Sequence, residues 1–304
     1  MNESLHAYMR VGLIHFMAYP DTIKGEGPIE STLRKIAMDD YFDAVELTWI
    51  KDAAERDRVA RMLESAHMSV AYGAQPRLLT QSLNINDTDD AARQKALATL
   101  KEGVDEAYAL GAESLAFLSG KYEEATKEEA YQALLKSTKE LCAYAKSKGD
   151  LQISHEVFDY DIDKKSLIGP ADLALRYAKD VRREYDNFGL MVDLSHLPLI
   201  RETPKEAILP IKEYLVHAHI GNCVVKDPSL PGYGDQHPRF GFPGGENDIP
   251  ELVAYLQVLK DIGFLNREKP PILSFEVKPV AGEDPDVVIA GSKRVLNQAW
   301  AQVR

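Results

Sequence analysis

Carboxylate and imidazole side chains recur near the ends of apolar segments in the second half of the chain. The segments ISHEVFD, MVDLSH, VHAHIGN and SFEVKP offer five candidates, namely Glu156, Asp193, His196, His219 and Glu276. A carboxylate buried among apolar residues must be paired, hydrogen-bonded or bound to a metal. Because few basic residues accompany these groups, we interpret them as parts of a cation site rather than as ordinary hydrogen-bonded core residues.

The neighbouring histidines differ in the roles that strand alternation predicts for them. Successive side chains of a strand face opposite sides, so His155 should face away from Glu156 and pack as a core residue. His217 shares a face with His219 but lies one layer deeper, which predicts a supporting role. His15, at the end of the first apolar segment, could contact a substrate.

A long loop supplies further candidates. Residues 222–247 read NCVVKDPSLPGYGDQHPRFGFPGGEN, which is rich in glycine and proline and lacks helical or strand periodicity. Structureless loops of this length in compact domains are usually functional. Asp235 and His237 could hold a second metal, although we favour binding of substrate hydroxyls or capping of a turn. Arg239 and Lys278 are candidate substrate contacts.

The elements that must position these residues are eight short apolar segments separated by helical patterns. The predicted strands are 11–16, 44–49, 69–74, 114–118, 151–158, 189–194, 215–220 and 272–277. Eightfold alternation of strand and helix predicts a parallel sheet that closes into one (β/α)8 TIM barrel over residues 1–304. An open doubly wound sheet is the alternative, and the absence of a glycine-rich phosphate loop after the first segment speaks against it.

Two helices carry clear start and stop signals. Asp89 or Asp90 should cap a helix whose apolar face runs through Leu97 and Leu110, and Gly111 should end it. Asp284, followed by proline, should open the last helix.

Composition narrows the classes of function. The chain has 304 residues and a formal net charge of −12, which opposes binding to nucleic acid. No apolar run reaches the roughly 20 residues of a membrane span, and the first ten residues lack the pattern of a signal peptide. With two cysteines and therefore no disulfide framework, we expect a cytoplasmic protein.

Taken together, these motifs resemble the xylose-isomerase-like TIM-barrel superfamily of sugar isomerases and epimerases, which also contains endonuclease IV. Glu156, the D-x-x-H from Asp193, the H-x-H from His217, the stretch FPGGENDI and Glu276 carry the resemblance. It implies metal coordination by Glu156, Asp193, His219 and Glu276, with His196 beside the substrate. It also implies a homodimer or tetramer.

The endonuclease branch fits less well. It also resembles the chain at Asp235 and His237, but it carries histidines at the ends of strands three and four. The corresponding segments here read AYGAQP and AFLSGKY and contain none. Together with the acidic charge, this makes a sugar the expected partner and DNA an unexpected one.

The expected chemistry is proton transfer next to a carbonyl, through an enediolate. Glu156 and Glu276 would be the acid–base groups, and an oxygen-rich ligand set suits Mn²⁺ best, with Mg²⁺, Co²⁺ or Zn²⁺ as alternatives. The main alternative is a lyase that performs β-elimination on 3-keto glycosides, with a partner subunit. A hydride shift would need a lysine at an inner strand position, and only Lys278 could supply it. A metal-free sugar-binding barrel is a third possibility, which the loss of one of the four ligands would indicate, and none is lost.

Overall fold

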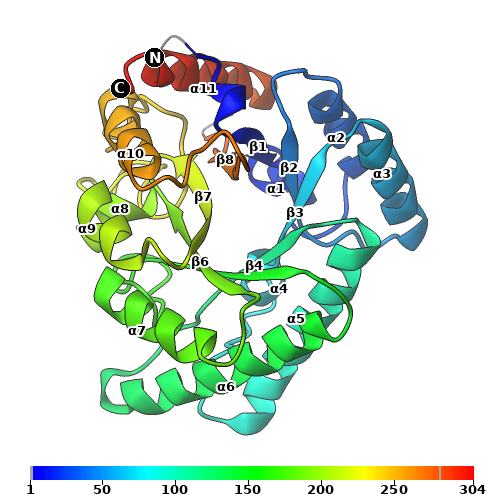
Figure 1. Ribbon diagram of the computed structural model, residues 1–304, viewed down its shortest axis with the longest axis vertical. Helices are drawn as coiled ribbons and strands as arrows, with labels where there is room; N and C mark the ends of the chain where they lie inside the picture. Colours follow the sequence, from blue (N-terminus) through cyan, green and yellow to red (C-terminus); the bar gives the residue numbers. More distant parts are fainter. Residues whose placement is uncertain (1–2, 281) are drawn as a thin grey trace.

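Eight parallel strands form a closed barrel in the computed structural model, which describes residues 3–280 and 282–304. The strands follow one another around the barrel in chain order, and β1 pairs with both β2 and β8 (Figure 1). Their bounds are β1 (Arg10–Ile14), β2 (Ala44–Leu47), β3 (Ser69–Gly73), β4 (Ser114–Leu118), β5 (Gln152–Glu156), β6 (Phe188–Asp193), β7 (Leu215–Gly221) and β8 (Ile272–Glu276). The predicted TIM barrel is confirmed, and the open sheet is excluded because the ring closes.

Helices surround the barrel (Figure 1), and the first and last described segments meet, because the Trp300 indole N–H donates to the Glu3 carbonyl at 3.0 Å. The helices are α1 (His15–Ala18), α2 (Ile29–Ala37), α3 (Ala53–Ser65), α4 (Gln75–Leu79), α5 (Asp90–Ala109), α6 (Lys127–Lys146), α7 (Ala171–Arg182), α8 (His196–Ile200), α9 (Pro204–Ile208), α10 (Ile249–Asp261) and α11 (Pro285–Trp300). Short 3₁₀ turns are η1 (Leu5–Ala7), η2 (Pro20–Thr22), η3 (Glu124–Thr126) and η4 (Leu209–Ile211). Short helices therefore follow β1, β3 and β6 directly, at the end of the barrel where the chain leaves each strand.

The predicted capping signals are present in the structure. The Asp89 carboxylate accepts the backbone N–H of Ala92 at the start of α5, and Asp284 does the same for Asp286 and Val287 at the start of α11. These contacts satisfy N–H groups that a helix leaves free in its first turn. Gly111 follows α5 with a φ of 70°, the left-handed conformation typical of a helix stop.

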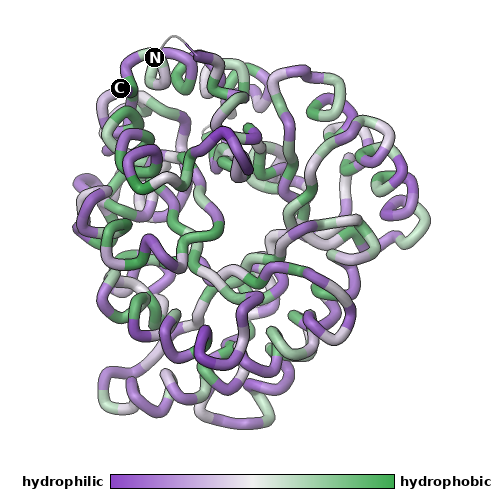
Figure 2. The backbone as a smooth tube through the Cα atoms, in the orientation of Figure 1, coloured by the Kyte–Doolittle hydropathy of each residue, from purple (hydrophilic) through white to green (hydrophobic). Residues whose placement is uncertain are grey.

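Strand residues alternate between two kinds of environment. Large apolar side chains such as Leu13, Val45, Phe117 and Phe275 belong to the core between the barrel and the helices. A separate small cluster consists of Ala44, Ala71 and Ile272, one residue each from β2, β3 and β8. Figure 2 shows the hydrophobic strand segments inside the ring of helices, with hydrophilic segments towards the outside.

Close packing inside the barrel requires a residue without a side chain in β1. A Cβ atom on Gly12 would lie 2.2 Å from the Ser274 Oγ of β8. Gly12 pairs with Ser274 in the register of the two strands. The interior is therefore too narrow at this level for a side chain on both β1 and β8.

A register shift brings two candidate ligands level with each other. Between β6 and β7 the pairing moves from Leu190 opposite Leu215 to Met191 opposite His217. Beyond this irregularity Asp193 lies opposite His219. The shift therefore places an inward carboxylate and an inward imidazole side by side.

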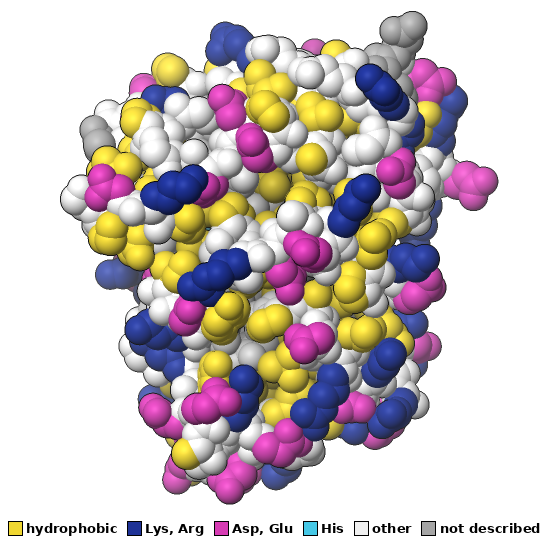
Figure 3. All heavy atoms as spheres, turned by 90° about the vertical axis from the view of Figure 1, so that its left-hand side faces the viewer, with side chains coloured by type: hydrophobic (Ala, Val, Ile, Leu, Met, Phe, Trp, Pro, Cys, Tyr) yellow, Lys and Arg dark blue, Asp and Glu magenta, His cyan; other side chains and the backbone are white. Residues whose placement is uncertain are grey.

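The outer surface is that of an acidic protein with mixed charges. On the face drawn in Figure 3, acidic and basic side chains are interspersed with hydrophobic ones. Among the helices of residues 3–280 and 282–304, each is too short or too polar to cross a lipid bilayer.

Candidate metal centre

Four acidic or imidazole side chains converge at the C-terminal end of the barrel. Glu156, Asp193, His219 and Glu276 come from β5, β6, β7 and β8, and each offers one ligand atom within 4.8 Å of the others. All four side chains are buried. The structure thus brings together the four residues that the sequence resemblance implied as ligands.

Two oxygens in this group are buried without a hydrogen-bond donor among the described residues. Glu156 Oε1 and Asp193 Oδ2 have no hydrogen-bond partner, and their nearest imidazole nitrogens, His219 Nδ1 and His237 Nδ1, lie 3.5 and 3.7 Å away. The second oxygen of each carboxylate accepts a hydrogen bond. Glu156 Oε2 accepts the amide of Gln75 at 2.7 Å, and Asp193 Oδ1 accepts the backbone N–H of Ser195 at 2.7 Å. An unpaired buried carboxylate oxygen is costly unless a cation completes it, so these residues fit a metal ion.

The imidazole in the group is oriented by a carboxylate on the far side of its ring. His219 Nδ1 lies 2.9 Å from Glu276 Oε2 and 3.5 Å from Glu156 Oε1, so this nitrogen faces the proposed ligands. Its Nε2 lies 3.1 Å from Glu46 Oε1, which also lies 2.7 Å from His217 Nε2. An acceptor at Nε2 fixes the tautomer that leaves Nδ1 free to bind a metal.

Glu46, at the end of β2, is a site residue that the sequence reasoning missed. It is buried and lines the same cavity as the proposed ligands. Burial alone raises the pKa of its carboxyl group, but the adjacent His217 and His219 hold that pKa well below its usual range. The signal was a glutamate inside an otherwise apolar segment, AVEL.

The electrostatics of the group also favour a cation. Burial raises the pKa of Asp193 to about 6; His196 partly offsets this rise, and Glu276 adds to it. Burial lowers the pKa of His219, but Glu46, Glu156 and Glu276 together raise it well above its usual value. The carboxylates thus attract positive charge to the position that a metal would occupy.

A second group lies beside the first and includes both residues of the D-x-H motif. Asp235 Oδ1 lies 3.0 Å from His196 Nε2 and 2.9 Å from His237 Nε2, and its Oδ2 lies 2.8 Å from Lys164 Nζ. Although burial raises the pKa of Asp235, Lys164 and the two imidazoles hold it well below its usual range. Because Lys164 already neutralises Asp235, this carboxylate has an ionic partner without a second metal.

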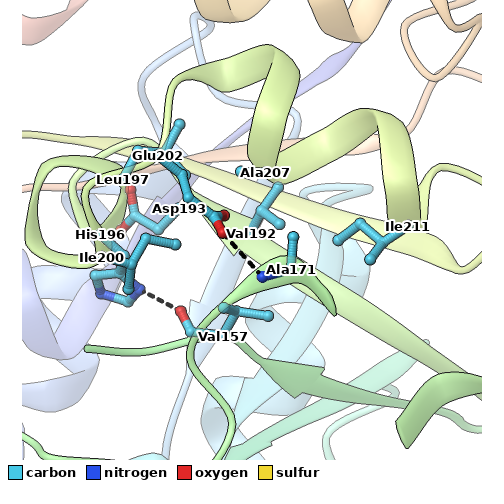
Figure 4. A pocket seen from close by; sticks show the side chains of 10 residues that line it. All are labelled: Val157, Ala171, Val192, Asp193, His196, Leu197, Ile200, Glu202, Ala207 and Ile211. Atoms are coloured by element: carbon cyan, nitrogen blue, oxygen red, sulfur yellow. Dashed lines mark hydrogen bonds between the residues drawn. The ribbon is translucent and has the colours of Figure 1, made fainter. Parts of the chain in front are cut away.

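His196 and His237 each have a second contact at Nδ1, on the side of the ring away from Asp235. His196 donates Nδ1–H to the Val157 carbonyl at 2.8 Å, as drawn in Figure 4, where it borders a void of about 10 Å³. Such a void has room for no more than one water. His237 Nδ1 lies 3.2 Å from Ser195 Oγ, and the Glu276 and Asp235 carboxylates overcome the effect of burial and raise its pKa to about 9.

A cavity of about 180 Å³ opens onto the proposed ligands. One part of its lining is apolar: Ile14, Phe16, Met17, Ile23, Pro76, Leu79 and Phe158. The other part is polar or charged: Glu46, Gln75, Thr80, Glu156, Lys164, His219, Asp235, Gln236, His237, Glu276 and Lys278. A small polar molecule with an apolar face would fit such a lining.

The remaining candidates divide into residues inside and outside this cavity. Lys278 lines it, with Nζ 3.3 Å from Gln236 Oε1, and residues 235–237 bring the long loop to the barrel mouth as predicted. The structure does not bring Arg239 to the cavity, because its guanidinium donates to Glu283 at 2.8 Å. Lys164 was missed, since its loop has no periodicity to place it.

Two further histidines lie away from the cavity. His15 begins α1 instead of ending β1 and faces Thr32, with Nε2 2.7 Å from its hydroxyl, so the structure does not make it a substrate contact. Burial lowers the pKa of His15 to about 3, which keeps the imidazole neutral. His155 packs edge-on against Phe117 and Tyr177, on the helix side of the barrel as expected.

Fold and site together define a parallel eight-stranded barrel enzyme candidate with a buried carboxylate–imidazole group at its C-terminal end. Residues 37–295 match the family model described as xylose isomerase-like TIM barrel, and the chain belongs to this family. No curated protein sequence matches the chain.

Solved structures with the same architecture include several sugar epimerases. A D-tagatose 3-epimerase-like protein is 17% identical with a TM-score of 0.72, over 97% of this chain and 98% of its own. The D-psicose 3-epimerase with D-tagatose from Clostridium cellulolyticum H10 is 16% identical with a TM-score of 0.69, over 96% and 99%. An IOLI protein with a bound zinc atom is 16% identical with a TM-score of 0.73, over 97% and 99%. At these identities the likeness concerns the fold.

Proposed function

We propose that this protein is a divalent-metal-dependent sugar isomerase or epimerase that moves a proton next to a carbonyl through an enediolate. The observation that carries the proposal is the pair of buried oxygens without a hydrogen-bond partner, Glu156 Oε1 and Asp193 Oδ2, within a four-residue ligand group. These ligands border a cavity that is polar on one side and apolar on the other.

Glu156 and Glu276 are the proposed acid–base groups. They end β5 and β8, three strands apart in the ring, and both line the cavity. One carboxylate takes the proton from the carbon beside the carbonyl, and the other returns it to the same or the adjacent carbon. Gln75 donates to Oε2 of Glu156 at 2.7 Å and so fixes this carboxylate beside the cavity.

The proposed metal ligands are Glu156, Asp193, His219 and Glu276. A bound Mn²⁺ would polarise the substrate carbonyl and stabilise the negative charge that develops on its oxygen. Oxygen-rich ligand sets with one imidazole suit Mn²⁺, while Mg²⁺, Co²⁺ and Zn²⁺ remain alternatives to be compared. A structural relative contains zinc, which supports including Zn²⁺ in that comparison.

The proposal is tested by incubating Mn²⁺-loaded protein in D₂O with D-fructose, D-tagatose, D-psicose, the corresponding aldoses and 3-keto glycosides. We expect conversion of at least one sugar, with deuterium incorporated at the carbon next to the carbonyl. Conversion without deuterium at early and late times would contradict proton transfer and favour a hydride shift near Lys278. Release of an aglycone from a 3-keto glycoside would instead favour the lyase.

A further inference from the structure

A second cavity lies beside the proposed active site at the same end of the barrel. It has a volume of about 330 Å³ and shares two lining residues, Leu79 and Lys164, with the metal-side cavity. The lining comprises Leu78, Leu79, Ser82, Leu83, Asn84, Leu118, Ser119, Gly120, Lys121, Lys164 and Ser166. At about 30 Å³ per water, it has room for on the order of ten waters, the size of one further ring.

The chemistry of this side cavity is apolar with a polar edge. Leu78, Leu79, Leu83 and Leu118 supply the aliphatic surface, and Leu79 is 44% exposed although it borders both cavities. The hydroxyl of Ser166 is buried and has no hydrogen-bond partner among the described residues. An exposed leucine and an unpartnered buried hydroxyl are both features that a bound ligand would satisfy.

The loop that carries Lys164, which lines both cavities, is held in a defined conformation. The buried Asp159 carboxylate accepts backbone N–H groups of Ile162, Asp163 and Lys164 at 2.7–2.8 Å. Lys164 is fixed in turn by Asp235, at 2.8 Å. The boundary between the cavities is therefore built before any ligand binds, as a specific subsite requires.

We propose that the side cavity is a subsite for a ring joined by a glycosidic bond to the reacting sugar. The substrate is then a glycosylated sugar rather than a free monosaccharide. The aliphatic surface covers the apolar face of the added ring, and Ser166 meets one of its polar groups. A second sugar and an aryl group share this chemistry. This inference rests on the proposed function, since it places the reacting sugar in the metal-side cavity.

The test measures binding rather than turnover. The Mn²⁺-loaded protein is titrated with D-fructose, with the glycosyl-fructose disaccharides lactulose and isomaltulose, and with α- and β-anomers of 4-nitrophenyl glucoside. We expect at least one glycosylated probe to bind tenfold or more tightly than D-fructose. Preference for a disaccharide identifies the ring as a sugar, and preference for a nitrophenyl glucoside identifies it as an aryl group.

Substitutions test whether the preference for glycosylated probes arises in the side cavity. Leu83→Trp fills that cavity without touching the metal-side cavity and should remove the preference while leaving D-fructose binding unchanged. Leu209→Trp is the matched control, since Leu209 is 46% exposed and borders neither cavity. Ser166→Ala is the conservative second variant, and it should weaken only the glycosylated probes, by about 2- to 10-fold.

Equal affinity for D-fructose and every glycosylated probe would overturn the subsite, as would an equal loss for all probes in Leu83→Trp. The outcome is separable from that of the proposed function. Deuterium exchange with free ketoses together with equal affinities would keep the proposed function and remove the subsite. If Leu83→Trp removed a preference for glycosides and no sugar exchanged deuterium, the subsite would be kept and the proposed function removed.

Discussion

Replacing Glu46 by glutamine should weaken metal binding although Glu46 is not one of the four proposed ligands. Its Oε1 lies 2.7 Å from His217 Nε2 and 3.1 Å from His219 Nε2, and it carries the charge that orients both rings. A glutamine can place its one acceptor oxygen where Oε1 lies, but it lacks the negative charge that Glu46 presents to both rings. The contact to His219 Nε2 would then be weaker, and Nδ1 would be a less basic and less firmly oriented metal ligand.

The size of the effect follows from the burial and the number of contacts. Loss of the carboxylate behind a metal-ligating histidine typically costs 10- to 100-fold in metal affinity. Because Glu46 is buried and contacts two imidazoles, we expect the upper part of that range, about 100-fold or roughly 2.7 kcal/mol.

The assay is competition between the protein and a chelator for Mn²⁺, with circular dichroism to verify the fold. Glu113→Gln is the control, since Glu113 contacts Arg10 through an ion pair at the start of β1, and its affinity for Mn²⁺ should stay at the level of the unmodified protein. An affinity of Glu46→Gln within twofold of the unmodified protein would refute the reasoning. Loss beyond about 10⁴-fold would also contradict it, because Glu46 would then be a ligand itself.

Three further predictions concern catalysis, protons and packing. Glu156→Gln and Glu276→Gln should each lower turnover by about 10²- to 10⁴-fold in steady-state kinetics, with the fold retained. If both variants kept more than a tenth of the activity, the proposed acid–base roles would be contradicted. Mn²⁺ binding at pH 7 should release about one proton, because the pKa of His219 is raised well above its usual value. At pH 6 it should release more, because Asp193, with a pKa of about 6, is then half protonated. Both protons compete with the metal, so affinity should rise with pH; calorimetry in two buffers counts the protons, and a pH-independent affinity would count against this site. Gly12→Ala should destabilise the fold by about 1–3 kcal/mol in urea unfolding, because its Cβ would meet Ser274 Oγ at 2.2 Å, and an unchanged midpoint would show that the interior can relax.

Much of the site could be predicted from the sequence because a parallel barrel gathers the C-terminal ends of its strands at one end. Glu156, Asp193, His219 and Glu276 each follow or end an apolar segment, so the strand pattern alone places them in one neighbourhood. Their mutual distances depend on register, which includes the irregular pairing after Leu190 that sequence periodicity does not reveal.

Other features depend on contacts between distant parts of the chain. Glu46 finds its partners 171 and 173 residues away, so its position inside the apolar segment AVEL indicates burial but not which residues it contacts. Lys164 lies in a loop shaped by backbone hydrogen bonds to Asp159, which no periodicity predicts. His15 differs from expectation because β1 ends at Ile14, two residues before the predicted end, so that His15 begins α1. Arg239 differs because its guanidinium group donates to Glu283.

The proposed chemistry requires one metal ion held by four side chains. Anomalous diffraction from crystals grown with Mn²⁺ measures this without reference to any substrate. We predict a single strong peak bound by Glu156, Asp193, His219 and Glu276, at about 2.0–2.4 Å from their ligand atoms. Absence of a peak at full Mn²⁺ loading, or a peak held by other residues, would contradict the central claim.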